Sequence, residues 1–115
     1  RTTPTEKTPA QMGTEIGQVA KNQGGTPVLA ERLSGLNLPQ AQGTEATEAA
    51  LWATGMRPAR PVVLSNGDVA IPIAQEGRGQ PVMIIKPDGR IQSGRADLQW
   101  DLKTWRMNVE SVRVE

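Results

Sequence analysis

The stretch VVLSNGDVAIPI, residues 62–73, carries the clearest structural signal in the chain, because two runs of β-branched residues flank a turn sequence. Asn66-Gly67 between such runs is the strongest short-range hairpin signal, since a type I′ turn needs positive φ at both central positions. Pro72 has no amide hydrogen, so the second strand should lie at an edge or have its amide side free there. We therefore predict an antiparallel hairpin with a type I′ turn.

A second hairpin follows, from residues 82–85 to residues 90–92, with its turn at Lys86-Pro87-Asp88-Gly89. Proline at the first central position and glycine at the last suit a type I turn. Residues 82–85 are apolar on both faces, which is typical of a central strand covered on two sides. The sequence EGRGQ, residues 76–80, is expected to be a flexible connector between the hairpins.

The C-terminal end alternates between apolar and polar residues. The apolar positions are Leu98, Trp100 and Leu102, then Trp105, Met107 and Val109. Val112 and Val114 are out of phase with them, which predicts a bulge or bend near Glu110-Ser111. Residues 57–115 are thus expected to form a compact antiparallel β meander of five to seven short strands, curled into a small barrel or roll or packed on helices.

Short helices are predicted before this meander. Thr8 can cap a helix with Pro9 at its first position, and Gln11 completes a capping box. A narrow apolar stripe is formed by Met12, Ile16 and Val19. Gly13 and Gly17 each cost up to about 1 kcal/mol relative to alanine, so this helix should need a partner surface.

Two more helices complete the expected α+β fold. Thr26 is the expected cap of the second helix, with Pro27 at its first position and Gly35 as its stop. Its apolar face consists of Leu29, Leu33 and Leu36. The third helix is expected over residues 44–56 after a loop, with Glu45 and Glu48 in its first turn. The predicted organisation is a flexible arm at residues 1–7, helical segments at 8–56 and the β domain at 57–115.

Composition excludes several kinds of chemistry. The 115 residues fit one domain and contain no cysteine and no histidine, so thiolate chemistry, disulfides and the commonest general base are absent. No apolar run approaches the length of about 18 residues that a membrane span needs. We expect no cofactor and no metal. The missing cysteine is compatible with the cytoplasm but leaves the localisation open.

Acidic residues and turn residues give weak functional signals. Asp97 and Asp101 would share one face of a strand. We expect that face to be exposed to solvent, and we do not expect the two carboxylates to be catalytic. Asn66 and Asp68 are required by the hairpin turn itself, which outweighs a role as a binding loop. The GRGQP segment lacks the later glycine and lysine of a phosphate loop. An enzymatic function is therefore not expected.

Arginine and tryptophan form the candidate interaction surface. Its members are Arg57, Arg60, Arg78, Arg90, Arg95, Trp100, Trp105 and Arg106. Arginine suits phosphate or carboxylate groups, and tryptophan can stack on bases. The alternative is that acidic neighbours neutralise the arginines and that tryptophan is core, because the chain contains three Trp but no Phe or Tyr. Three buried Trp would favour a scaffold, whereas two exposed Trp beside Arg would favour nucleic acid.

The net charge of +1 is too balanced for a dedicated nucleic-acid binder. The first residue is Arg1 rather than methionine, which suggests a piece of a longer polypeptide. The leading expectation is a non-enzymatic structural or protein-interaction module in a larger assembly, such as a phage particle or secretion or conjugation machinery. Its partners would be another protein or other copies of the chain. The alternative is a small nucleic-acid-binding β module that uses Arg and Trp.

Overall fold

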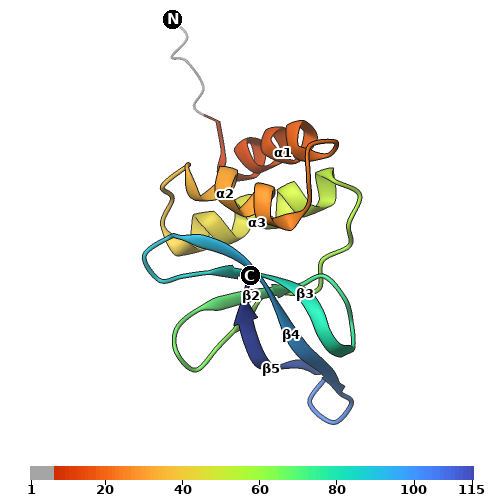
Figure 1. Cartoon of the computed structure of the whole chain (residues 1–115). Coiled ribbons are helices and arrows are strands. Elements are labelled where there is room, and N and C mark those ends of the chain that lie inside the picture. The colour runs from red at the N-terminus through yellow and green to blue at the C-terminus, as the bar shows by residue number, and fades with distance from the viewer. Residues whose placement is uncertain (1–6) are drawn as a thin grey trace, which may run out of the picture.

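The computed structural model describes residues 7–115, so most of the predicted flexible arm lies outside the described residues. The elements are α1 (Pro9–Ala20), α2 (Thr26–Ser34), α3 (Gln40–Ala53), β1 (Val62–Val63), β2 (Val69–Pro72), β3 (Gly77–Ile85), β4 (Ile91–Asp101) and β5 (Arg106–Val114). The strands form one antiparallel sheet in the order β1-β2-β3-β4-β5. Figure 1 shows the helices on one side of this sheet, which curls into a half-barrel. The predicted α+β fold with an antiparallel meander is confirmed, and the meander has five strands, within the predicted range of five to seven.

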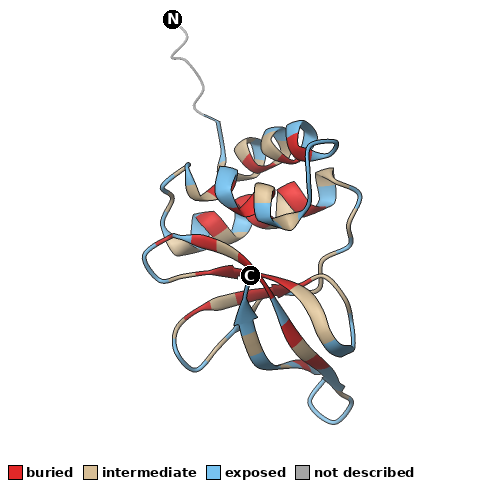
Figure 2. Ribbon diagram, in the orientation of Figure 1, coloured by how far each residue is buried: buried red, intermediate tan, exposed pale blue. Residues whose placement is uncertain are grey.

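Strand β3 lies at the centre of the sheet and is buried on both faces, as its sequence predicts. Met83 and Ile85 pack in a cluster with residues of all three helices, whereas Val82 and Ile84 pack with β4 and β5 on the other face. All four side chains are at most 1% exposed. Figure 2 shows buried residues on the inner helices and along the central strands, so one sheet separates two apolar clusters.

Helix α1 begins as predicted but buries a different face. The capping box of Thr8 and Gln11 is present, with the Gln11 amide donating to Thr8 Oγ1 at 3.1 Å. Val19, expected in the apolar stripe, is exposed. Gly13 and Gly17 are buried instead, against the backbone of α3. Glycine allows this close approach because it has no Cβ.

The expected boundaries of α2 and α3 need correction. Gly25 occupies the N-cap position of α2 and Thr26 is its first residue, without a side-chain cap. Helix α3 begins at Gln40 after Pro39, so half of the expected loop is helical. Glu45 and Glu48 consequently lie beyond its first turn. Among the helices of residues 7–115, none combines the length and apolar character that a membrane crossing requires.

Both central hairpins turn in the same way, and neither turn is type I′. The Gly67 amide donates to the Leu64 carbonyl at 3.0 Å, and Gly67 adopts φ of +91° while Asn66 does not adopt positive φ. The second hairpin repeats this pattern between Gly89 and Lys86 at 2.9 Å. This is a three-residue loop that ends in a left-handed glycine. Three-residue loops of this kind also match the twist of the strands, so the type I′ prediction was wrong although the hairpin is confirmed.

The other differences between the predicted and the observed strands lie at irregular segments. The predicted connector, residues 76–80, mostly belongs to β3, where the register shifts between Gly77 and Gln80. Leu102 and Trp105 lie in the turn that joins β4 to β5, not in strands. The bulge predicted near residues 110–111 is confirmed, because Ser111 adopts φ of +53° and the register shifts opposite it.

Pro72 occupies the position that its missing amide allows. Strand β1 pairs with β2 only at residues 69 and 70, so its ladder ends before Pro72. The Pro72 carbonyl accepts a hydrogen bond of 2.8 Å from the Ala59 amide. The prediction that the amide side of β2 is free at this point is confirmed.

Candidate functional site

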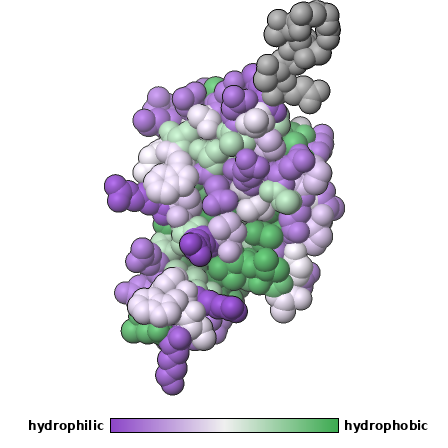
Figure 3. Space-filling view, turned by 180° about the vertical axis from the view of Figure 1, so that it is seen from behind, coloured by the Kyte–Doolittle hydropathy of each residue, from purple (hydrophilic) through white to green (hydrophobic). Residues whose placement is uncertain are grey.

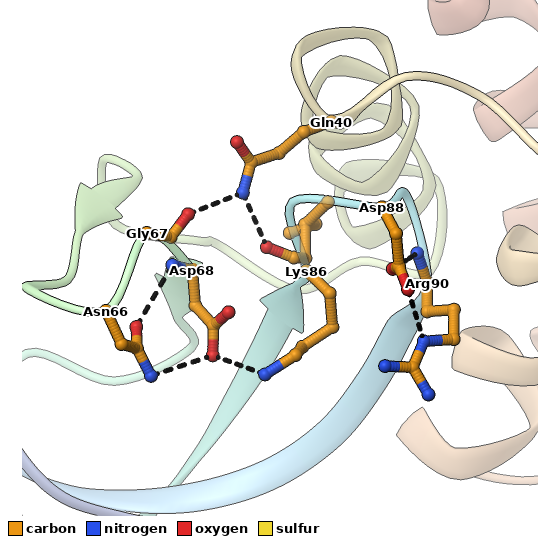
Figure 4. A network of polar contacts seen from close by, with 8 residues as sticks. Gln40, Asn66, Gly67, Asp68, Lys86, Asp88 and Arg90 are labelled. Carbon is orange, nitrogen blue, oxygen red and sulfur yellow. Dashed lines mark hydrogen bonds and ion pairs between the residues drawn. The ribbon is translucent and has the colours of Figure 1, made fainter.

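The turn at residues 65–68 is held in a polar network that joins it to α3 and to the second hairpin (Figure 4). Gln40 Nε2 donates to the carbonyl oxygens of Gly67 at 2.8 Å and Ile85 at 3.0 Å. Asp68, which is buried, pairs with Lys86 at 2.9 Å and accepts from Asn66 Nδ2 at 3.2 Å. These side chains are engaged in fixing the two turns, which agrees with a structural role for this loop.

Two further carboxylates of the sheet, Asp97 and Asp101, also hold a bulge and a turn. Asp97 Oδ1 accepts from the Gly79 amide at 2.9 Å, across the bulge of β3. Asp101 Oδ1 accepts from the Lys103 amide at 2.9 Å and, at 3.4 Å, from the Thr104 amide. The Lys103 hydrogen bond is the main cause that lowers the pKa of Asp101 below its usual value. Asp101 therefore stays ionised and fixes the turn that precedes β5.

The pKa of Asp88 is lowered for a similar reason. The backbone amide of Arg90 donates to Asp88 Oδ1 at 3.0 Å, and the Arg90 side chain pairs with Oδ2 at 2.8 Å. Glu48 on α3 behaves in the opposite way, since burial and then the charge of Glu45 raise its pKa. None of these carboxyl groups lines the pocket that residues 59–63 and 105–107 help to enclose.

That pocket, of about 650 Å³, lies between the two edges of the curled sheet. Its lining consists of Ala59, Arg60, Pro61, Val62, Val63, Gln75, Trp100, Trp105, Arg106 and Met107. Residues 59–63 come from β1 and the segment before it, and residues 105–107 come from the end of the β4–β5 turn and the start of β5. The incomplete closure of the sheet thus creates the pocket. We call it the Arg–Trp pocket.

The three indoles are all at the surface. Trp52 is 57% exposed, Trp100 39% and Trp105 72%. The interpretation of tryptophan as core is therefore wrong, because the apolar clusters are built from aliphatic side chains. Trp100 and Trp105 meet in the Arg–Trp pocket, whereas Trp52 on α3 does not line it. The exposure pattern is the one that favours the nucleic-acid alternative.

The candidate arginines separate into two groups. Arg60 and Arg106 line the Arg–Trp pocket, and neither forms an ion pair within residues 7–115. Arg90 pairs with Asp88 and Arg95 with Glu115 outside the pocket. Arg57 and Arg78 do not line it either. The structure therefore brings together four of the eight predicted site residues, which are Arg60, Trp100, Trp105 and Arg106.

Other lining residues gave no functional signal in the sequence. Gln75 and Met107 are examples, since each has an ordinary place in a loop or strand. Among the lining residues Val63 is exposed, and exposed apolar groups continue beyond the pocket at Leu102 and Val114. Figure 3 shows hydrophobic side chains at the surface of the strand-rich half, next to strongly hydrophilic ones.

Trp105 has an unusual backbone conformation, with φ of +56°. Such a conformation is uncommon for a residue with a bulky side chain and costs about 1–3 kcal/mol. The indole gains little burial in return, being mostly exposed. A strained and exposed tryptophan at a pocket is a reason to suspect a ligand there.

No group of three or more His, Cys, Asp or Glu side chains within residues 7–115 is arranged to hold a metal ion. Comparisons with protein-family models, curated proteins and solved structures found no match to this chain. A functional proposal therefore depends on the chemistry of the Arg–Trp pocket.

Proposed function

We propose that this chain is a non-enzymatic binding module whose ligand is nucleic acid, bound at the Arg–Trp pocket. The observation that carries the proposal is the meeting of two exposed indoles, Trp100 and Trp105, with Arg60 and Arg106. Indoles stack on bases of any sequence, and the planar guanidinium group suits phosphate oxygens. The lining contains no acidic side chain that would repel a phosphate.

The positions of Trp100, Trp105 and Arg106 on neighbouring segments of the sheet support the same function. Trp100 faces Met107 across the β4–β5 ladder, and Trp105 and Arg106 precede Met107 on the neighbouring segment. Asp101 lies opposite Arg106 in this ladder, but its Oδ1 accepts from turn amides, and it forms no ion pair with Arg106. Arg106 is therefore available to an anionic ligand.

The test is the affinity of the chain for a fluorescently labelled oligothymidine, measured by anisotropy at low salt. We expect micromolar or tighter binding that weakens as salt is added, because phosphate contacts release counterions. The double variant Arg60→Gln/Arg106→Gln should bind more weakly and lose most of the salt dependence, because both phosphate contacts are removed. Arg90→Gln is the matched control, since Arg90 pairs with Asp88 outside the pocket. Affinity no better than about 10⁻⁴ M would contradict the proposal, because non-specific basic surfaces reach that level.

A protein-interaction module in a larger polypeptide or assembly is the second candidate. It is favoured by β5, a nine-residue edge strand that pairs with β4 alone. Edge strands offer backbone groups to a strand of a partner. Val63, Leu102 and Val114 add exposed apolar surface near the two sheet edges. This candidate would be favoured if the chain self-associates, if Val114→Lys abolishes the self-association, and if the chain binds no oligonucleotide.

A further inference from the structure

We infer that the Arg–Trp pocket takes a short unpaired stretch of one to three nucleotides, held mainly by stacking and only secondarily by charge. The inference rests on the proposed function and specifies its ligand. Three properties of the pocket lead to it, namely its size, its small number of free charges and its exposed indoles.

Size limits the ligand to a short segment. Pockets of about 300–1,000 Å³ enclose ligands of drug size, and the 650 Å³ of the Arg–Trp pocket falls within this range. Its walls come from both edges of the sheet, so a bound ligand would lie between residues 59–63 and residues 105–107. A splayed nucleotide can do so. The bases of a duplex are stacked on one another and cannot present their faces to Trp100 and Trp105.

The charges around the pocket support few phosphate contacts. Arg60 and Arg106 are the only charged residues that line it among residues 7–115. Further along the sheet two arginines are paired with acids, Arg95 with Glu115 at 3.3 Å and Arg113 with Asp97 at 3.8 Å. A long basic track for the backbone of a nucleic acid is thus interrupted. Affinity must come largely from the indoles.

The indoles are placed for stacking from two adjacent elements. Trp100 lies near the end of β4, and Trp105 ends the turn that follows, where φ of +56° presents its mostly exposed side chain. The turn is fixed by Asp101, whose carboxylate accepts from two backbone amides. Because the backbone of the turn is already held, little backbone freedom is lost when a base stacks on Trp105, which favours binding.

The test compares labelled oligothymidines of about 3, 6 and 12 nucleotides with a 12-base-pair duplex, in anisotropy titrations over a range of salt concentrations. Each phosphate neutralised on a single strand contributes about 0.7 to the slope of log K against log salt, so two arginines predict a slope between about −1 and −2. We expect affinity to level off by about 6 nucleotides and the duplex to bind at least roughly ten-fold more weakly.

Variants assign the stacking to particular residues. Trp105→Ala should weaken binding roughly 10- to 100-fold, and Trp105→Phe should restore most of it, because any aromatic face can stack. Trp52→Ala is the control, since Trp52 is similarly exposed but lies outside the pocket. Circular dichroism of each variant shows whether it is folded.

The outcomes separate this inference from the proposed function. Equal affinity for the duplex, a slope steeper than about −4, or unchanged affinity of folded Trp105→Ala would overturn the short single-stranded ligand while nucleic-acid binding stands. Absence of binding to every oligonucleotide would overturn both.

Discussion

Gly67 and Gly89 occupy the same position in two successive hairpins, and both adopt φ of +91°. In each hairpin the preceding side chain, Asn66 or Asp88, accepts a hydrogen bond of 3.0 Å from the amide two residues later. Such Asx turns hold the backbone in the conformation that leads into the left-handed glycine. The repetition shows that these sequence positions are required by the turns.

Gly67→Val should lower the free energy of unfolding by about 1–3 kcal/mol, because a β-branched residue resists positive φ. The measurement is chemical denaturation followed by circular dichroism. Ser65→Val in the same turn is the matched control, since Ser65 is exposed and does not adopt positive φ. Equal stability of the two variants would show that the turn tolerates a side chain at residue 67.

Trp105 is the residue at which stability and function are expected to conflict. Trp105→Gly should keep or raise the free energy of unfolding, by up to about 1 kcal/mol, since glycine adopts positive φ without strain. Oligonucleotide affinity should fall in the same variant because the stacking surface is lost. Thermal denaturation and anisotropy measure the two effects. A stability loss above about 1 kcal/mol would mean instead that the indole is needed for folding.

At the scale of elements, two helical glycines should respond in opposite ways to one substitution. A Cβ at Gly13 on α1 would collide with the carbonyl oxygen of Ala46 on α3, whereas a Cβ at Gly43 would lie 3.5 Å from Ile85 in ordinary contact. Gly13→Ala should therefore destabilise the protein by about 1–3 kcal/mol, because the helices must move apart. Gly43→Ala should stabilise it by up to about 1 kcal/mol through helix propensity.

Thermal denaturation of both variants measures this difference. Stabilisation by Gly13→Ala would mean that α1 is not packed against α3 through its glycines. Equal destabilisation by Gly43→Ala would place the start of α3 closer to the sheet than the 3.5 Å contact allows.

Sequence reasoning identified these elements well where the signal is local. The capping box at Thr8, both hairpins and the doubly buried strand β3 depend on neighbouring residues, and all were predicted. The start of α3 was missed because a loop was expected up to residue 44, although the proline at residue 39 also suits a position just before a helix. Residues 76–80 contain two glycines, which indicated a linker but permit a bulged strand instead.

At the scale of the whole molecule, the candidate site could be predicted only in part. Arg60 and Arg106 are far apart in sequence and meet because the sheet curls until its edges approach. Residue types suggested an arginine and tryptophan surface, but only tertiary structure selects which four of its eight members share a pocket. The separation of free from ion-paired arginines has the same origin, because the partners Glu115 and Asp97 are brought close by strand pairing.

The same curled sheet determines whether the helical half can fold. Ile16 and Ala20 of α1 belong to one apolar cluster with Leu51 of α3 and with Ile71 and Met83 of the sheet. The sequence predicted that α1 needs a partner surface. Helix α3 supplies most of that surface, and the chain's own sheet covers α2 and α3.

Removal of residues 56–115 should therefore unfold the helices, because isolated helices shorter than about 12–15 residues are marginal in water. Helix α1 has 12 residues with two interior glycines, and α2 has 9. Amide hydrogen exchange on the verified monomeric chain should show strong protection at residues 12–19, and the same amides should exchange freely in the fragment 1–55. Persisting protection in a monomeric fragment would show that α1, α2 and α3 fold together without the sheet. Weak protection in the intact monomer would instead indicate that a partner is needed to order them.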